Sequence, residues 1–186
     1  LGADYYASSL HKWLCAPLGT GMLYIKQNKI RNIWALLSNN EPDGPDIRKF
    51  ESLGTRSFAS EMAIGTAIDF HNSIGTARKF ARAHYLKNYW MERVKDLPGV
   101  KIHTSLKPEF AGAVALFSID GMKPGEIDGQ LLNKYKIHTT AIEWENIKGV
   151  RVTPHVYHTP KDLDRLVTAI TAISEKQALA GKQKKS

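Results

Sequence analysis

The segment ADYYASSLHKWLCAPLGTGMLYI, from Ala3 to Ile25, sets a short polar cluster between two runs of strand-forming residues. Asp4 to Ser8 and Met22 to Ile25 are the predicted strands. Between them, two hydroxyls, a histidine and a lysine fill four of the five positions from Ser8 to Lys12. Binding sites are commonly built at the edge of a sheet, so the cluster is a candidate site. The alternative is an ordinary exposed loop, in which the lysine is simply solvated.

The composition is that of a globular protein. Apolar residues make up 42% of the 186 residues, enough for one domain, or for the remnant of a large domain plus a small one. No apolar run approaches the roughly 20 residues that a membrane-spanning helix needs, so we expect no membrane partner. The start lacks a methionine and a signal-peptide pattern, so we expect it to lie inside a larger protein. A single cysteine, Cys15, excludes an internal disulfide and favours a reducing compartment, the cytoplasm.

The net charge is +8, from 26 basic and 18 acidic side chains. Part of this excess comes from residues 176–186, which carry four lysines and no acid and which we expect to be a frayed, solvated tail. A basic surface can attract nucleic acid. The sequence has no zinc-type spacing, Walker loop or RNA-binding aromatic motif to support that reading, so we expect no nucleic-acid partner.

The rest of the chain alternates between helical and strand patterns. A Pro- and Gly-rich loop at Ser38–Asp46 precedes the first helical pattern, which starts at Ser60. The predicted elements after it are a helix over Thr76–Leu97, strands over Val100–His103 and Ala113–Ile119, a helix over Pro124–Tyr135, strands over Ile137–Trp144 and Val150–Thr153 separated by a turn at Asn146–Gly149, and a last helix capped by Thr159 and reaching about Ile173. This order predicts helices layered on a small sheet.

The pattern Ser-x-His-Lys, followed by Gly-x-Gly and a strand, resembles the lysine segment of the class V aminotransferase family, which are fold-type I pyridoxal 5'-phosphate (PLP) enzymes. The resemblance implies that Lys12 is the Schiff-base lysine and that Ser9 and His11 bind the PLP phosphate. An amine that is partly desolvated is less strongly protonated, which suits addition to an aldehyde. Cys15 has no matching role, and we interpret it as a small packed side chain.

Two later segments match the same family in order and spacing. In FESLGTRSF, from Phe50, the resemblance implies that Gly54 and Thr55 reach across a dimer interface to the partner subunit's PLP phosphate. Two interpretations remain for Arg56, which are a further contact to an anion and a surface salt bridge. In VRVTPHVYHT, the resemblance implies that Arg151 binds the substrate carboxylate, for which its planar fork is suited. A purely structural arginine is the alternative, and the nearby histidines and tyrosine are read as packing and capping residues.

The resemblance implies an α/β chain that forms the C-terminal part of a PLP-dependent transferase fold. Residues 1–75 would be a remnant of the large PLP-binding domain, residues 76–175 the small C-terminal domain and residues 176–186 the tail. The family's ring-stacking residue and pyridine-nitrogen partner lie upstream of the lysine, in sequence absent here. We therefore expect a partner in the missing N-terminal half and a homodimer with shared active sites.

The implied function is a PLP-dependent enzyme acting on an amino acid or amine, as an aminotransferase, epimerase or lyase, and closest to the isopenicillin N epimerase-like branch. Cysteine desulfurases of this family place a nucleophilic cysteine before the carboxylate arginine, and Ile137–Val150 has none, so we expect a different reaction. Glu143 and Trp144 are predicted to line the substrate side of the site. The alternative is a non-catalytic fragment or interaction module that retains the fold.

Overall fold

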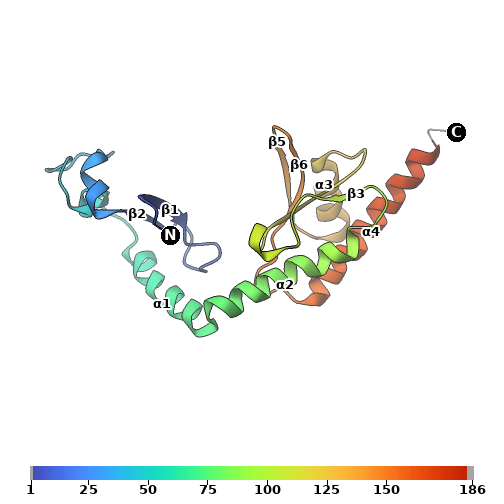
Figure 1. Ribbon diagram of the computed structural model, residues 1–186, viewed down its shortest axis with the longest axis horizontal. Coiled ribbons are helices and arrows are strands. Elements are labelled where there is room, and N and C mark those ends of the chain that lie inside the picture. The colour runs from blue at the N-terminus through green and yellow to red at the C-terminus, as the bar shows by residue number, and fades with distance from the viewer. Residues whose placement is uncertain (1, 184–186) are drawn as a thin grey trace. The chain divides into compact units, whose positions relative to one another are not determined.

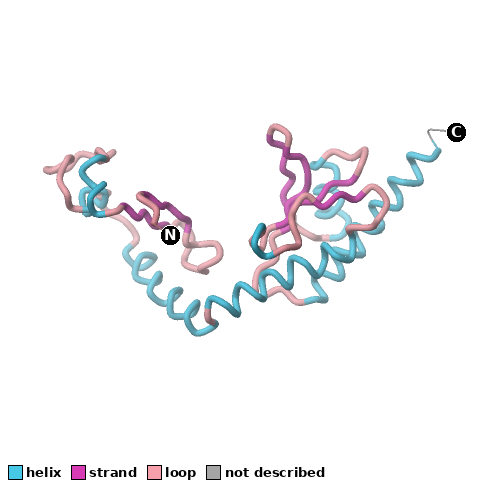
Figure 2. Tube along the Cα trace, in the orientation of Figure 1, coloured by secondary structure: helices cyan, strands magenta, loops and turns pink. Residues whose placement is uncertain are grey.

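A computed structural model describes residues 2–183, and the chain divides into two compact units with the boundary between Gly75 and Thr76 (Figure 1). The first contains one small sheet, two 3₁₀ turns and a helix, and the second contains a larger sheet and the other helices (Figure 2). None of the helices in residues 2–183 is long and apolar enough to cross a membrane.

The first unit begins with an antiparallel hairpin. Strand β1 (Tyr5–Ser9) pairs with β2 (Gly21–Ile25), with Ser9 opposite Gly21 at the loop end. Both strands lie within one residue of their predicted bounds. The rest of the unit comprises η1 (Gln27–Asn32), η2 (Ile47–Glu51) and α1 (Phe58–Ile74), and α1 begins two residues before the predicted start.

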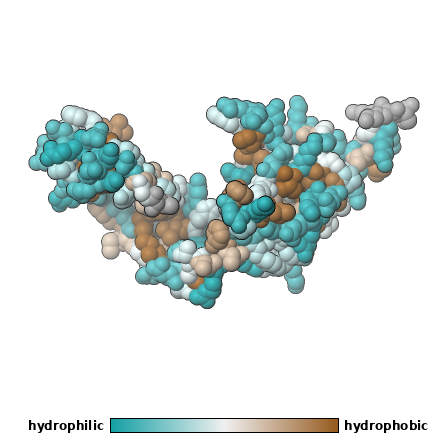
Figure 3. Space-filling model, in the orientation of Figure 1, coloured by the Kyte–Doolittle hydropathy of each residue, from teal (hydrophilic) through white to brown (hydrophobic). Residues whose placement is uncertain are grey.

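The first unit buries little of its apolar surface. Ile25 and Ile30 are buried, and the buried Lys49 donates its Nζ proton to the Ile30 carbonyl at 2.8 Å. Most of the large apolar side chains stay exposed, and brown surface is visible over this unit in Figure 3. Strands β1 and β2 pair only with each other among residues 2–183. An isolated two-stranded hairpin is marginally stable in water. Within residues 2–183 this sheet therefore gains little stability from strand pairing.

The second unit is an antiparallel sheet covered by helices. The strand order is β3-β4-β6-β5, and every neighbouring pair is antiparallel. The elements are α2 (Thr76–Val94), β3 (Val100–Ile102), η3 (Pro108–Phe110), β4 (Ala115–Ile119), α3 (Pro124–Tyr135), β5 (Thr140–Trp144), β6 (Ile147–Val152) and α4 (Pro160–Gln183). The predicted type of each α-helix and β-strand is confirmed, and η3 was not predicted.

The core of the second unit lies between one face of the sheet and the three helices. Trp90 of α2 is fully buried, and its ring meets Phe117 of β4 edge-on with 5.7 Å between centroids. Ile127 of α3, Val150 of β6 and Ile170 of α4 are also fully buried in the same cluster. Alternate strand residues point to opposite faces of a sheet. The neighbours of these core residues along β4 and β6 therefore belong to the other face.

Several predicted boundaries in the second unit are wrong: α2 ends at Val94 rather than Leu97, and β5 begins at Thr140 rather than Ile137. The turn expected at Asn146–Gly149 is instead a two-residue connection between Trp144 and Ile147, with Glu145 at φ 48°. A positive φ is typical of such tight hairpin connections, and no Gly marked the position. Helix α4 also continues past Ile173, so residues 176–183 are helical rather than a frayed tail, and residues 184–186 lie outside the described part.

Candidate functional site

The predicted lysine lies in the loop that joins β1 to β2. The Leu10 N–H donates to the Thr20 carbonyl at 3.0 Å, and the Ala16 N–H donates to the Leu10 carbonyl at 3.1 Å. Within the loop, the Cys15 N–H donates to the Lys12 carbonyl at 3.1 Å. These bonds fold the loop back on the end of the hairpin, so the backbone at Lys12 is held in place while its side chain is exposed.

The three predicted cofactor ligands of this loop lie within four positions of the sequence. Lys12 makes no ion pair within residues 2–183, so its amine is available to a ligand. His11 is half-buried, and its Nδ1 lies 3.2 Å from the Thr20 carbonyl oxygen. A carbonyl can only accept, so Nδ1 carries the proton and Nε2 is the ring nitrogen left for a ligand. Ser9, at the end of β1, is exposed.

The chemistry of this loop fits PLP. An amine, a hydroxyl and an imidazole stand within four positions, and residues 8–20 contain no acidic side chain. Such a set can bind a phosphate and also present a primary amine to an aldehyde. One interpretation from the sequence is wrong: Cys15 is exposed, at φ 66°, rather than packed.

The Gly54-Thr55 pair lies just before α1. Gly54 has φ 71°, a conformation that other residues adopt only with strain, and Thr55 is exposed. Arg56 pairs with Glu61, which matches the salt-bridge alternative. No hydrogen bond in residues 2–183 joins Thr55 to the β1–β2 loop. The assignment of Gly54 and Thr55 to a partner subunit's phosphate stays a prediction.

Arg151 lies on β6 between the buried Val150 and Val152, and its side chain is exposed on the opposite face. Its Nη2 donates to Thr140 Oγ1 of β5 at 3.3 Å. It pairs with no carboxylate within the described chain, in contrast to Arg48 and Arg56. Arginine side chains are mostly exposed and are almost never fully buried unless they are paired. The charge of Arg151 is therefore not neutralised by a carboxylate in residues 2–183, and its assignment to the substrate carboxylate stays a prediction.

The neighbours of Arg151 divide between the two faces of the sheet. Register places Trp144 opposite Ile147, on the same face as Arg151. Glu143 lies on the other face, where it pairs with Lys148 at 3.5 Å. Glu143 therefore faces away from Arg151, because side chains alternate along a strand. That Glu143 and Trp144 line the substrate side stays a prediction.

The turn after β6 contains the histidines and tyrosine that the sequence interpreted as packing and capping residues. The rings of His155 and Tyr157 stack at 4.7 Å, and those of Tyr157 and His158 stack at 4.8 Å. The His155 N–H donates to His158 Nδ1 at 2.9 Å, which closes the turn. These contacts agree with that interpretation.

Sequence reasoning missed a buried polar cluster on α2. Lys87 is fully buried and donates to the Ser105 carbonyl at 2.7 Å, and His84 is buried with no hydrogen-bond partner on either ring nitrogen in the described structure. Burial lowers the pKa of both groups, and the charge of Lys87 lowers that of His84 further. The i, i+3 spacing of the two residues on one helix face was the available signal.

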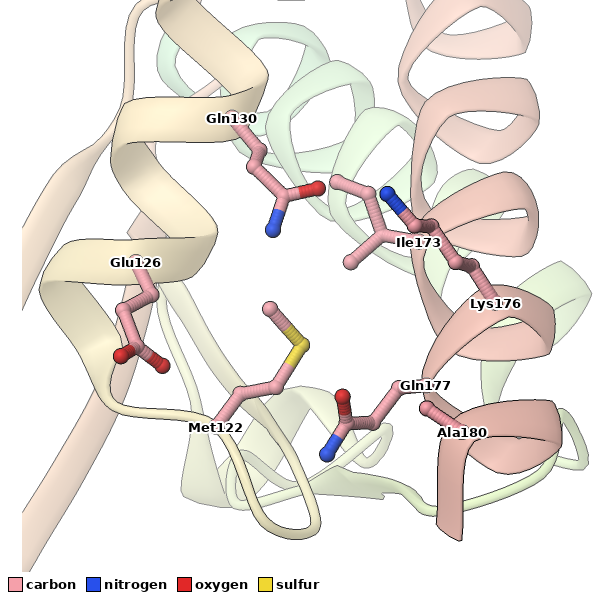
Figure 4. Close-up of a pocket in the computed structure, with 7 residues that line it drawn as sticks. All are labelled: Met122, Glu126, Gln130, Ile173, Lys176, Gln177 and Ala180. Carbon is pink, nitrogen blue, oxygen red and sulfur yellow. The ribbon is translucent and has the colours of Figure 1, made fainter. Parts of the chain in front are cut away.

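A cavity between two helices of the second unit shares no residue with the predicted site. A cavity of about 300 Å³ lies between α3 and α4, with Met122 between the facing helices (Figure 4). Its other lining residues are Glu126, Gln130, Ile173, Lys176, Gln177 and Ala180. None of the residues predicted to bind cofactor or substrate lines it.

Known proteins similar to this chain include several PLP enzymes. Isopenicillin N epimerase from Streptomyces clavuligerus is 27% identical over 92% of this chain and 47% of its own length. A probable cysteine desulfurase from Streptomyces coelicolor is 28% identical over 91% of this chain and 44% of its own length. The relatives thus include an epimerase and a probable cysteine desulfurase. They give no support to the expectation that desulfuration is excluded for this protein.

Solved structures give the same fold. The cysteine desulfurase CsdA from Escherichia coli matches with a TM-score of 0.77 at 20% identity, over 92% of this chain and 46% of its own. A C-DES variant with glycine covalently linked to its PLP cofactor matches with a TM-score of 0.72 at 19% identity, over 92% of this chain and 46% of its own. The predicted fold class, an α/β part of a PLP-dependent transferase fold, is confirmed.

The chain spans about half the length of the curated relatives it matches. The family model described as Aminotransferase class-V matches residues 1–166, from the start of the chain into α4. The match includes the β1–β2 loop, the segment before α1 and the strand that carries Arg151. The chain therefore belongs to the class-V aminotransferase family.

Proposed function

We propose that the protein containing this chain is a PLP-dependent enzyme that acts on an amino acid or amine. The observation that carries the proposal is the exposed amine of Lys12, which has no ion pair in the described chain and lies beside Ser9 and His11 in a loop without acids. Family membership supports the cofactor, because the chain matches the class-V model over residues 1–166.

Each predicted site residue has a distinct task. When bound, PLP supplies an electron sink for the charge that develops at the substrate α-carbon. The Lys12 amine anchors the cofactor covalently and moves a proton at that carbon. Ser9 and His11 hold the phosphate. Gly54 and Thr55 bind the phosphate in a partner subunit, so the enzyme is a homodimer with shared sites. Arg151 binds the substrate carboxylate with its planar fork.

The reaction class is proposed from this chain alone. The segment Ile137–Val150 becomes β5, the tight turn and the start of β6, and it carries no thiol. Without a nucleophilic cysteine before Arg151, the persulfide route of cysteine desulfurases has no acceptor there. We therefore favour an epimerase, aminotransferase or lyase reaction. Release of alanine and persulfide sulfur from cysteine by the full-length protein would refute this part.

The test uses the full-length protein that contains this chain. It should show a visible absorption band, and borohydride reduction followed by peptide mass analysis should place a pyridoxyl group on Lys12. The variant Lys12→Ala should lose the label and about 10²-fold or more of the activity, since a positioned proton-transfer group contributes about 10²- to 10⁴-fold.

Lys26 is the matched control because it lies in the same unit and is already paired with Asp4 at 3.6 Å. The variant Lys26→Ala should keep both the band and the label. A colourless wild-type protein, or a label that persists in Lys12→Ala, would count against the proposed function and favour a non-catalytic module.

A further inference from the structure

The face of the second sheet that carries Arg151 lies opposite the face that packs on α2, α3 and α4. Val150 and Val152 point into the core, so Arg151 between them points the other way. The register pairs Arg151 with Thr140 on β5 and with Leu116 on β4. Directly opposite residues in neighbouring strands share a face. The guanidinium therefore emerges from a row of three side chains on one surface.

The contact within this row is a single hydrogen bond to a neutral group. Arg151 Nη2 donates to Thr140 Oγ1 at 3.3 Å. A guanidinium carries five N–H donors in a fixed plane, so this bond engages one edge and leaves the others free. Because the acceptor is a hydroxyl and not a carboxylate, the bond orients the group without neutralising its charge. No carboxylate in residues 2–183 forms an ion pair with Arg151.

Thr140 is well suited to hold this orientation. Its β-branched side chain has a restricted χ1, and the strand fixes its backbone in the sheet. An arginine side chain has several rotatable bonds, and a ligand that bound it would otherwise have to order them at the moment of binding. A partner that orders part of the side chain beforehand strengthens binding by removing that loss.

We propose that Thr140 is a positioning residue for Arg151, which orients the guanidinium for the α-carboxylate of the substrate. The inference rests on the proposed function, in which Arg151 binds that carboxylate. Thr140 acts through Arg151 and does not itself touch the substrate. It should therefore affect ligands that carry a carboxylate and leave simple amines unaffected.

The experiment compares glycine with methylamine as ligands of the full-length holoprotein. The two probes share the amine, and only glycine has a carboxylate. Glycine is chosen because the similar C-DES structure holds it on its cofactor. Apparent dissociation constants come from the change in the cofactor's visible absorption, which requires no turnover. For Thr140→Val we expect glycine to bind about 3- to 10-fold more weakly, which corresponds to the usual net contribution of one hydrogen bond, with methylamine unchanged.

Two further variants separate positioning from general damage. Thr140→Ser keeps the hydroxyl and should restore most of the glycine affinity. Thr168→Val removes an exposed hydroxyl from α4, where Oγ1 donates to the Asp164 carbonyl at 2.9 Å, and should change neither affinity. If melting curves show that Thr140→Val is unfolded, Thr140→Ala takes its place and should show the same pattern.

A double-mutant comparison tests the route through Arg151. Arg151→Lys removes Nη2, so Thr140→Val should cause no further loss of glycine affinity in that background. A loss of glycine affinity of equal size in both backgrounds overturns the proposal. So does a Thr140→Val variant whose glycine affinity is unchanged or whose methylamine affinity falls equally. A wild-type protein whose absorption does not change with glycine also overturns it. Failure of the proposed function is separate, because it appears as a wild-type protein that borohydride does not label at Lys12.

Discussion

Lys12 and Lys87 carry the same amine in opposite surroundings. Lys12 is exposed on the β1–β2 loop, while Lys87 is fully buried under the segment that contains Ser105. No carboxylate in the described residues forms an ion pair with either amine. Burial lowers the pKa of Lys87 because the charged form loses hydration. Burial thus makes the charged form of Lys87 less favourable, whereas the exposed amine of Lys12 stays accessible to a ligand.

His84 beside Lys87 predicts a loss of stability in mild acid. Burial first, and the charge of Lys87 second, lower its pKa, while Glu109 opposes them. The unfolded chain, with an ordinary histidine pKa near 6.5, then binds more protons than the folded chain below about pH 6.5. Stability should therefore fall as the pH drops from about 6.5 toward the lowered pKa of the folded state.

The variant His84→Leu should lose less stability on acidification than wild type, because it removes a neutral buried base with no hydrogen-bond partner on its ring nitrogens in the described structure. Thermal unfolding of the full-length protein between pH 7 and pH 5 measures the difference. His138→Leu, at an exposed position, is the control and should follow wild type. Parallel pH profiles for wild type and His84→Leu would contradict the assignment.

Among the elements, the β5–β6 hairpin extends past the edge of its neighbour. Strand β6 pairs with β4 only from Val150 onward, while its pairing with β5 continues to Ile147. The strand passes close to β4 at Gly149, where an added Cβ would lie 2.5 Å from the Phe117 carbonyl oxygen and 3.0 Å from a Leu116 side-chain carbon. This close approach to backbone explains a glycine in mid-strand.

Gly149→Ala should therefore destabilise the second unit by about 1 to 3 kcal/mol, the usual effect of overpacking, because a backbone carbonyl cannot move aside. Gly125→Ala is the control, since a Cβ at that α3 position meets nothing within 4 Å and alanine is the better helix former. Chemical denaturation of both variants measures the contrast. Equal stability of the two would show that the strand can shift.

The start of α4 is fixed by side chains. Asp162 accepts hydrogen bonds from the Thr159 N–H and hydroxyl, both at 2.8 Å, and these bonds lower the pKa of the Asp162 carboxyl. The sequence pattern of a Thr cap followed by Pro160 predicted this start. The helix begins at Pro160, so the prediction is confirmed.

Thr159→Ala should cost about 1 kcal/mol of stability, the usual effect of losing an N-cap. Thr159→Ser keeps the hydroxyl and should lose much less. Denaturation midpoints of the two variants measure the difference. Because α4 contributes several residues to the core, the loss should appear in the unfolding of the whole second unit. A midpoint unchanged in Thr159→Ala would mean that the cap does not stabilise this helix.

For the whole molecule, the two units differ in how much apolar surface they bury. The hydrophobic cluster of buried residues lies entirely between Leu86 and Ile173, in the second unit. In the first unit, Tyr5, Tyr24 and Phe58 each remain about half exposed, and the two-stranded sheet has no other strand beside it in residues 2–183. A unit that leaves so much apolar surface uncovered gains little free energy on folding.

Limited proteolysis of the 186-residue chain should therefore leave a resistant fragment that starts near Thr76 and should degrade residues 2–75 first. Peptide mass analysis over a time course measures the order of cleavage. In the longer protein that we propose, the β1–β2 region should become protected, because we expect further sequence to cover this hairpin. Equal resistance of both units in the isolated chain would contradict the prediction.

The candidate site was predictable where its parts are adjacent in sequence. Ser9, His11 and Lys12 share one loop, and the strands on either side of it follow from alternation and turn residues, which are local properties. The start of α4 was predictable for the same reason. The glycine and threonine at 54 and 55 also come from a local motif, although their predicted ligand belongs to another subunit.

By itself, the sequence determined the type of each α-helix and β-strand, the lysine loop and the family resemblance, because periodicity, caps and short motifs depend on neighbouring residues. Only the tertiary structure decided that Glu143 faces away from Arg151, that Cys15 is exposed, that α4 continues through Gln183, and that Thr140 contacts the arginine. Each of these depends on strand register, on packing or on contacts between residues far apart in the chain. A one-residue slip would move every side chain of a strand to the other face, and no local pattern around Arg151 fixed that register.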